Sequence, residues 1–126
     1  MKNHGVTINL IENDKTDLKQ ILEIVGELGK QSTWKLTNVE CFGKSAEILH
    51  EFSDNKKEIS GKEFYNAVLG IHQTIDGIFE AFNTNEISNW LLIRAIRGDE
   101  FDIETKHQEL LKKIRDSFKN VQDLVY

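Results

Sequence analysis

The chain has 126 residues, a net charge of −5 at pH 7, 39% hydrophobic residues and 29% charged residues. This length is typical of one domain, here residues 1–126, and the composition excludes a disordered or membrane-embedded chain. Because an acidic surface repels phosphates and anionic lipid head groups, we expect neither nucleic acid nor a membrane as a partner.

The first half of the chain predicts a strand, a helix, a second strand and a short helix. Residues 6–11 alternate apolar and polar side chains, as a strand with one buried face does. Residues 18–28 carry apolar side chains at helical spacing, and Gly29 ends that run. Residues 33–39 are rich in Trp, Thr and Val, which favours a strand, and residues 46–52 form an amphipathic helix. A strand, a helix and a strand in this order indicate a crossover unit, which is right-handed if its strands are parallel.

The middle of the chain begins with a helix and continues into an ambiguous stretch. Ser60 and Glu63 form a capping-box pair, which predicts that a helix begins there. Apolar residues from Phe64 to Phe82 keep a seven-residue rhythm, so the ambiguous residues 73–83 could continue one long helix. Against this, a glycine inside a helix costs about 1 kcal/mol, and Asp76-Gly77 is a turn dipeptide. We favour a break near Asp76 and a strand over residues 78–82.

The last third of the chain predicts a hairpin and a final helix. Residues 90–96 form a strand, residues 97–100 a hairpin turn, and residues 101–104 alternate as the return strand. Thr105 and Gln108 form a second capping-box pair that opens the last helix. The predicted order is therefore β-α-β-α-α-β-β-β-α. It indicates an α+β domain with a mixed or mostly antiparallel sheet of about five strands and helices mainly on one face.

The string Gly43-Lys44-Ser45 is the end of a phosphate-binding loop pattern. The full pattern needs a glycine at position 38, which is asparagine here, and Glu40 would repel a phosphate. We therefore interpret these residues as a strand end followed by a helix start, and we expect no nucleotide or other cofactor.

Two Glu-x-x-His pairs, Glu47/His50 and Glu104/His107, have the spacing of metal ligands on a helix. Glu47, His50 and Glu51 lie opposite the apolar stripe of their predicted helix, so they should face water. Glu104 falls at a strand end, before the predicted helix. We predict no metal site, with Glu47, His50 and Glu51 as the weak candidates.

Cys41 is the one cysteine, so an intramolecular disulfide is excluded, which fits a reducing compartment. No apolar run approaches the ~20 residues of a membrane-spanning helix, and the chain start does not resemble a signal peptide. These features predict a cytoplasmic protein. A small enzyme or a small-molecule or metal-binding protein with a site near Glu47, His50 and Cys41 is the alternative function.

The predicted sheet carries many charged residues and two tryptophans that could bind a partner. Arg94 is expected opposite Glu80 or Asp102, since opposite charges stabilise neighbouring strands. Trp34 and Trp90 are candidates for recognition, because tryptophan is enriched at binding hot spots. The predicted partner-binding residues are Glu80, Trp90, Arg94, Asp102 and Glu104.

No catalytic motif is present, so the sequence favours a non-enzymatic interaction module over an enzyme. We expect an acidic sheet face that binds a partner protein with a basic surface, as an inhibitor, an immunity-type factor or an assembly factor does. The apolar strand 90–96 must be covered on at least one face, and an uncovered sheet edge invites pairing. A symmetric homodimer is therefore a further expectation.

Overall fold

The computed structural model describes residues 4–124 as a sheet with helices and connecting turns. The helices are α1 (Leu18–Val25), α2 (Glu27–Lys30), α3 (Ala46–Asp54), α4 (Gly61–Val68) and α5 (Gln108–Ser117). The strands are β1 (His4–Asn9), β2 (Thr33–Gly43), β3 (Ile59–Ser60), β4 (Ile71–Phe82), β5 (Leu91–Ile96), β6 (Glu100–Thr105) and β7 (Gln122–Asp123).

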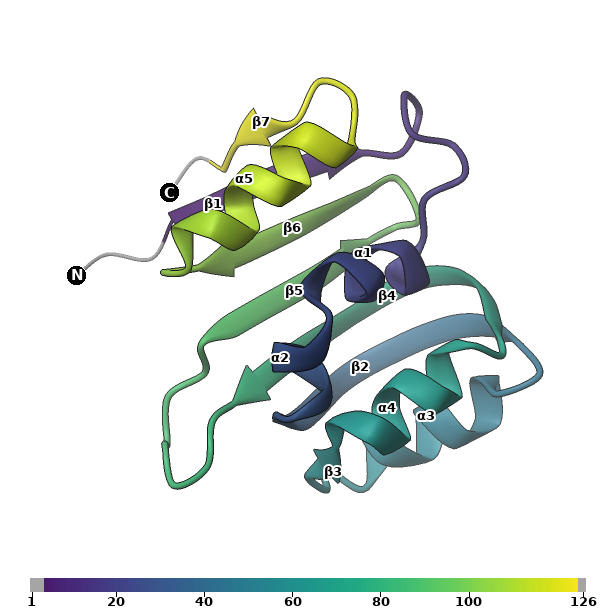
Figure 1. Cartoon of the computed structure of the whole chain (residues 1–126). Helices are drawn as coiled ribbons and strands as arrows, with labels where there is room; N and C mark the ends of the chain where they lie inside the picture. Colours follow the sequence, from purple (N-terminus) through teal and green to yellow (C-terminus); the bar gives the residue numbers. More distant parts are fainter. Residues whose placement is uncertain (1–3, 125–126) are drawn as a thin grey trace.

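The strands form one sheet in the order β3-β2-β4-β5-β6-β1-β7, and every neighbouring pair is antiparallel. The helices lie on one side of this sheet (Figure 1). The predicted α+β fold, with a mostly antiparallel sheet and helices on one face, is therefore confirmed. The sheet has seven strands rather than about five, because β3 and β7 add two residues each at its edges.

The expected crossover unit takes an unexpected place in the sheet. Helix α1 leads from β1 towards β2, but β4, β5 and β6 lie between these two strands. Since each neighbouring pair is antiparallel, β1 and β2 nevertheless run in the same direction. The first strand thus pairs with a strand from the end of the chain, which local patterns could not reveal.

Strand β4 runs unbroken from Ile71 to Phe82, so both the long helix and the break near Asp76 were wrong. It pairs with β2 on one side and with β5 on the other, and this pairing outweighs the local turn signal. Gly77 has a positive φ of 155°, and a Cβ there would lie 2.9 Å from the Phe79 ring. The glycine therefore fits the strand better than other residues would.

Two of the helix boundaries differ from the predicted ones. The helix predicted to run up to Gly29 ends at Val25. Gly26, which has a φ of 66°, caps it, and the short α2 follows. The Ser60 cap is confirmed, since its Oγ accepts a hydrogen bond from Glu63 N at 3.1 Å. The Thr105 cap was wrong, because Thr105 belongs to β6 and His107 Nδ1 accepts from Leu110 N instead.

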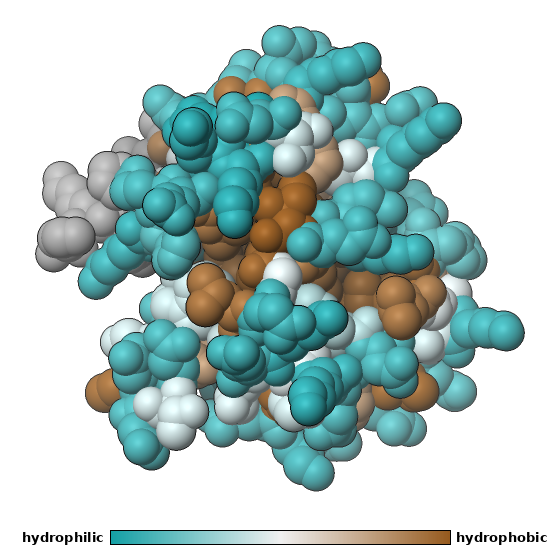
Figure 2. Space-filling view, in the orientation of Figure 1, coloured by the Kyte–Doolittle hydropathy of each residue, from teal (hydrophilic) through white to brown (hydrophobic). Residues whose placement is uncertain are grey.

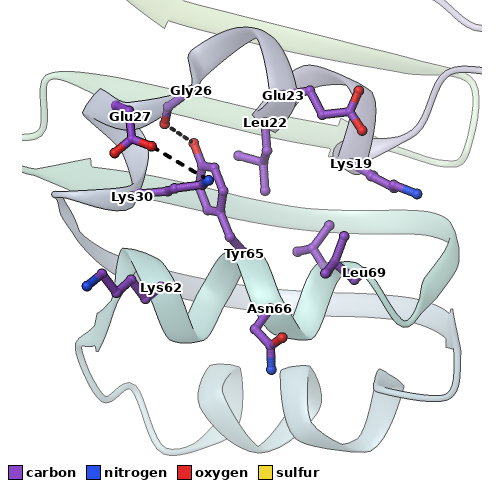
Figure 3. A pocket seen from close by; sticks show the side chains of 11 residues that line it. Lys19, Leu22, Glu23, Gly26, Glu27, Lys30, Lys62, Tyr65, Asn66 and Leu69 are labelled. Atoms are coloured by element: carbon purple, nitrogen blue, oxygen red, sulfur yellow. Dashed lines mark hydrogen bonds and ion pairs between the residues drawn. The ribbon is translucent and has the colours of Figure 1, made fainter.

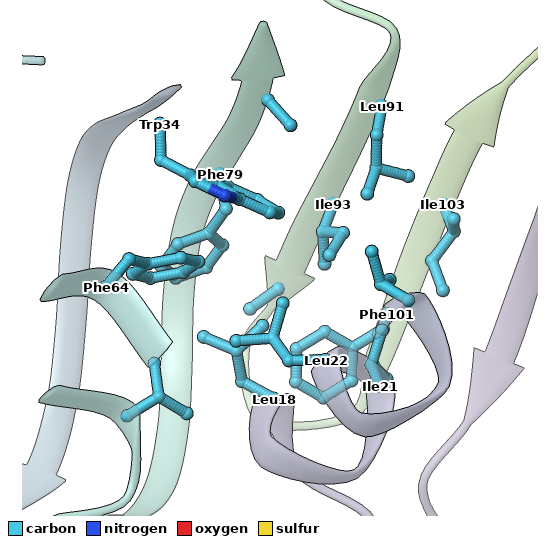
Figure 4. Close-up of a cluster of buried hydrophobic side chains, with 14 of the residues drawn as sticks. Leu18, Ile21, Leu22, Trp34, Phe64, Phe79, Leu91, Ile93, Phe101 and Ile103 are labelled. Atoms are coloured by element: carbon cyan, nitrogen blue, oxygen red, sulfur yellow. The ribbon is translucent and has the colours of Figure 1, made fainter. Parts of the chain in front are cut away.

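The core lies between the sheet and the helices (Figure 4). Trp34, Phe64 and Phe79 pack together there, with ring centroids 4.6 Å apart for Trp34 and Phe64 and 5.7 Å apart for Phe64 and Phe79. Trp34 is 0% exposed, and its Nε1 donates to the Gly29 carbonyl oxygen at 2.8 Å. Trp34 is therefore a core residue and takes no part in surface recognition.

Candidate functional site

Strand β5 shows how the two faces of the sheet differ. Leu91, Ile93 and Ala95 are buried and belong to the core under the helices. Leu92, Arg94 and Ile96 alternate with them and are only half-buried, because they point to the opposite face. No helix of the described residues covers this opposite face, which we call the open face (Figure 1).

Strands β1, β5 and β6 carry an ordered set of polar interactions on the open face. Arg94 lies opposite Asp102 in the β5–β6 register. This is one of the two pairings that the sequence predicted. The Arg94 guanidinium lies 3.9 Å from the carboxylate of Glu104. Asp102 is only 8% exposed, and its Oδ1 accepts a hydrogen bond from Thr7 Oγ1 at 2.7 Å. This carboxylate is thus held between β1 and β5.

Glu80 occupies a neighbouring row of the same face. It lies opposite Lys35 on β2, and its Oε2 accepts a hydrogen bond from Asn89 Nδ2 at 2.8 Å. The structure therefore brings Glu80, Arg94, Asp102 and Glu104 onto one face. Their charged groups, however, already make interactions within the chain.

Trp90 does not share the open face with these four residues. Its Nε1 donates to Ser32 Oγ at 2.9 Å, and its carbonyl oxygen accepts from Thr105 Oγ1 at 2.6 Å. The ring lies 6.3 Å from that of His107 and lines a hollow together with Leu28 of α2. Trp90 therefore contacts the helix side of the molecule at one end of the sheet.

A hollow of about 390 Å³ lies in the open face where β2 loses its regular register. Asn38 interrupts β2 with a φ of 51°, and the pairing shifts between Thr37 and Glu40. The hollow is lined by Asn38, Glu40, Asp76, Gly77, Ile78, Arg94, Ala95 and Ile96. Sequence reasoning missed this hollow, because its two carboxylates come together only through the pairing of Glu40 with Asp76.

The two carboxylates of the hollow differ in their surroundings. Glu40 is exposed and accepts no hydrogen bond from the described part of the chain. Asp76 accepts one from the Arg97 backbone N–H at 3.0 Å through its Oδ1. Ile78 and Ile96 place apolar surface beside them. The hollow thus presents carboxylate oxygens next to methyl groups, which suits the aliphatic stem and charged end of a lysine or arginine.

The open face as a whole is strongly acidic. Its apolar centre consists of Ile78, Leu92 and Ile96, each half-buried, and Arg94 lies among these three residues. Two cations lie on the face, Lys35 and Arg94. Six carboxylates share it, namely Glu40, Asp76, Glu80, Glu100, Asp102 and Glu104. These groups give the open face a net charge of −4, in a chain whose net charge is −5.

The alternative site near Cys41 is assembled on the other side, under α3. Cys41 Sγ lies 3.9 Å from His50 Nε2, and Glu47 and Glu51 are exposed on α3. Burial, helped by the charge of Asp17, raises the pKa of Cys41 to about 11. A nucleophilic cysteine needs the reverse, a thiolate at neutral pH, so this surrounding does not activate the thiol.

Neither of the other two motifs forms a site in the described residues. Between residues 4 and 124, no three His, Cys, Asp or Glu side chains gather in a way that could hold a metal ion. Gly43 ends β2 and α3 begins at Ala46, as the strand-end interpretation predicted. The Ser45 N–H donates to the Gly70 carbonyl oxygen at 3.3 Å, so it does not point at a phosphate site.

Comparisons with protein-family models, with curated proteins and with solved structures gave no match. Within the part of the chain that the structure describes, no helix is long and apolar enough to cross a membrane. The fold and the site thus define an antiparallel α+β protein with one helix-covered face and one acidic open face.

Proposed function

We propose that this protein is a non-enzymatic interaction module that binds a basic partner protein through the open face. One observation carries the proposal: six carboxylates and two cations share a sheet face, which no described helix covers, with three half-buried apolar residues. Protein interfaces commonly combine an apolar centre with a charged rim, and complementary charge speeds and orients their association.

The hollow indicates where a partner side chain would enter. Glu40 and Asp76 supply carboxylate oxygens, while Ile78 and Ile96 supply apolar surface for an aliphatic stem. A lysine or arginine of the partner fits this combination, with its cation at the carboxylates. Arg94 lines the same hollow and repels a second cation, so we expect one basic side chain to enter it.

Self-association through the open face is disfavoured, because two copies would place carboxylates against carboxylates. The outermost strands β3 and β7 offer only two residues each for pairing with a second copy, and the rest of β2 is irregular between Thr37 and Glu40, which disfavours continuous pairing there. The homodimer expected from the sequence is therefore a less favoured proposal than a basic partner. An inhibitor, an immunity-type factor and an assembly factor would all use such a face.

Charge reversal at the rim of the open face tests this function. Glu40 and Glu100 lie on opposite sides of the apolar centre, and neither forms a salt bridge within residues 4–124. The double variant Glu40→Lys/Glu100→Lys should therefore fold normally. Glu51→Lys/Glu109→Lys makes the same change in charge on α3 and α5, on the helix side, and is the matched control.

The measurement is affinity capture from cell extract with each form of the protein, quantified at low and at high salt. The unchanged protein should retain a basic protein at low salt and lose it as salt screens the charges. The open-face variant should bind about tenfold less of it, and the helix-side control should bind as the unchanged protein does. Capture that resists salt, or that is equal for the two variants, would rule out the electrostatic open face as the binding surface.

A further inference from the structure

The helix side, opposite the open face, carries a groove of its own. Figure 2 shows this side, where apolar residues are visible in hollows between the hydrophilic helices. One of these hollows runs between α1–α2 and α4 and has a volume of about 620 Å³ (Figure 3). Ligand sites typically occupy ~300–1,000 Å³, so the groove is large enough for a small molecule.

The middle of the groove is apolar. Leu22 and Val68, both buried, form part of its floor. Tyr65 crosses it, and its hydroxyl donates to the Gly26 carbonyl oxygen at 3.1 Å, which holds the ring in place. Burial, followed by the charge of Glu27, raises the pKa of Tyr65, so this hydroxyl stays neutral. Leu69 points towards Leu22 and is 64% exposed (Figure 3). Water thus reaches apolar surface that a ligand could cover.

The walls of the groove are held at a short, fixed separation. A Cβ on Gly61, the first residue of α4, would lie 2.2 Å from the Gly29 carbonyl oxygen in α2. Backbone atoms cannot move aside as a side chain can, so α2 and α4 pack closely there only because residue 61 is glycine. The groove is therefore preformed, which favours binding because little ordering is needed.

The two ends of the groove differ in charge. Lys30 and Lys62 lie towards the Tyr65 end, where Glu27 is paired with Lys30 at 3.7 Å. Lys62 forms no salt bridge with the described carboxylates. At the Leu69 end, Lys19 is accompanied by Glu23. In a chain of net charge −5, the Tyr65 end is thus a local cationic site beside apolar surface.

We propose that this groove binds an amphiphilic carboxylate, a molecule with a hydrocarbon chain and one terminal anionic group. Its carboxylate lies beside Lys62 and Lys30, and its chain passes over the Tyr65 ring to the space between Leu22 and Leu69. Charge complementarity at one end and burial of apolar surface at the other fix this direction. The site is independent of the open face, because its residues belong to α1, α2 and α4 and to Leu69 after α4.

The experiment is calorimetric titration of the full chain with decanoate, and with decyltrimethylammonium, which has the same chain and the opposite charge. Decanoate should bind saturably with one molecule per chain, and the cation should bind about tenfold more weakly. On adding decanoate, the methyl NMR signals of Leu22 and Val68 should shift.

Two pairs of matched variants locate the two ends of the ligand. Lys62→Glu should weaken decanoate binding about fivefold, while Lys57→Glu, in the turn before β3 and outside the groove, should leave it within about twofold. Leu69→Asp should weaken it about tenfold, whereas Ile87→Asp, at a residue 99% exposed, should have little effect.

The proposal would be overturned by absence of saturable decanoate binding, by equal binding of the cationic amphiphile, or by equal effects of a groove variant and its control. Leu69 is largely exposed, so its variant should keep the fold, which its thermal unfolding can verify. Methyl shifts elsewhere, with Leu22 and Val68 unchanged, would also contradict it. None of these outcomes bears on the open face, so the two proposals can fail separately.

Discussion

The two faces of the sheet differ in burial and in charge. Under the helices, the strands contribute fully buried apolar residues such as Phe79, Ile93 and Phe101. On the open face, the intervening positions of the same strands carry half-buried Ile78 and Leu92 among charged groups. Since neighbouring residues of a strand face opposite ways, one strand can contribute both to the core and to the proposed binding surface.

The comparison also shows that charge on the open face is of two kinds. Asp102 is buried and hydrogen-bonded by Thr7, so it stabilises the sheet. Glu40 is exposed and has no such partner in the described chain. The carboxylates of the first kind organise the face, and those of the second kind are the ones that the proposed partner would contact.

The adjacent residues Phe79 and Ile78 give the sharpest contrast between the faces. Phe79→Ala removes a ring that is 0% exposed and should lower the free energy of unfolding by about 3–5 kcal/mol. Ile78→Ala, on the open face, should lower it by only about 1 kcal/mol, because its side chain is half-buried. Urea unfolding of both variants measures the difference, and equal losses would mean that the open face is packed like the core.

The pH dependence of the free energy of unfolding tests whether the Cys41 thiol is buried under the helices. Its pKa rises from 9.0 to about 11 in the folded chain, so between these values the folded state keeps a proton that the unfolded state has lost. Stability due to this thiol is therefore complete below pH 9.0 and is lost as the pH rises to about 11, by at most roughly 2–3 kcal/mol.

The measurement compares urea unfolding of the unchanged protein and Cys41→Ala at pH 8 and at pH 10.5. The alkaline loss should be larger for the unchanged protein, since the variant has no thiol to titrate. Tyr65 also has a raised pKa, but it titrates in both proteins and cancels in the comparison. Identical alkaline losses in the two proteins would show that the thiol is not shielded by the covered face.

Removal of the Thr7–Asp102 hydrogen bond tests whether the buried carboxylate of Asp102 stabilises the sheet. Thr7→Val keeps the shape of the side chain but removes the donor, so Asp102 loses that hydrogen bond and stability should fall by about 1–2 kcal/mol. A double-mutant cycle with Asp102→Ala should give a coupling of about 1 kcal/mol. Additive effects in chemical denaturation would indicate that water replaces the threonine without loss.

Removal of the Ser60 side chain should have the smallest effect on stability. Its Oγ accepts from Glu63 N at the start of α4, so Ser60→Ala should destabilise the protein by about 1 kcal/mol. Ser88→Ala, in an exposed loop, is the control and should change the thermal unfolding midpoint very little. A loss no larger than that of the control would mean that α4 does not need its cap.

Much of the fold could be predicted, because alternation and helical spacing are local properties. Residues 90–96 and 101–104 were expected as a hairpin with two distinct faces, and β5 and β6 confirm it. The second half of β4 was expected as a strand over residues 78–82, but its first half was not, because Asp76-Gly77 looks like a turn and only pairing with neighbouring strands keeps it extended. Local sequence patterns do not predict such long-range strand pairing.

The candidate site was predictable only in part. The pairing of Arg94 with Asp102 follows from a two-strand register around a short turn. The hollow requires the irregular β2–β4 register, which depends on Asn38 adopting a positive φ. Trp90 was expected near the charged residues, but its hydrogen bond to Ser32 holds it towards the helix side. Such long-range contacts appear only when the chain is folded.

Site-specific photo-crosslinking tests the binding role of the open face most directly. A benzoylphenylalanine at position 92 would lie in the apolar centre of the open face, and one at position 48 would lie on exposed α3 as the control. We predict a crosslink to a basic protein from position 92 that disappears at high salt, and none from position 48. A crosslink from position 48 alone, or from neither position, would contradict partner binding through the open face.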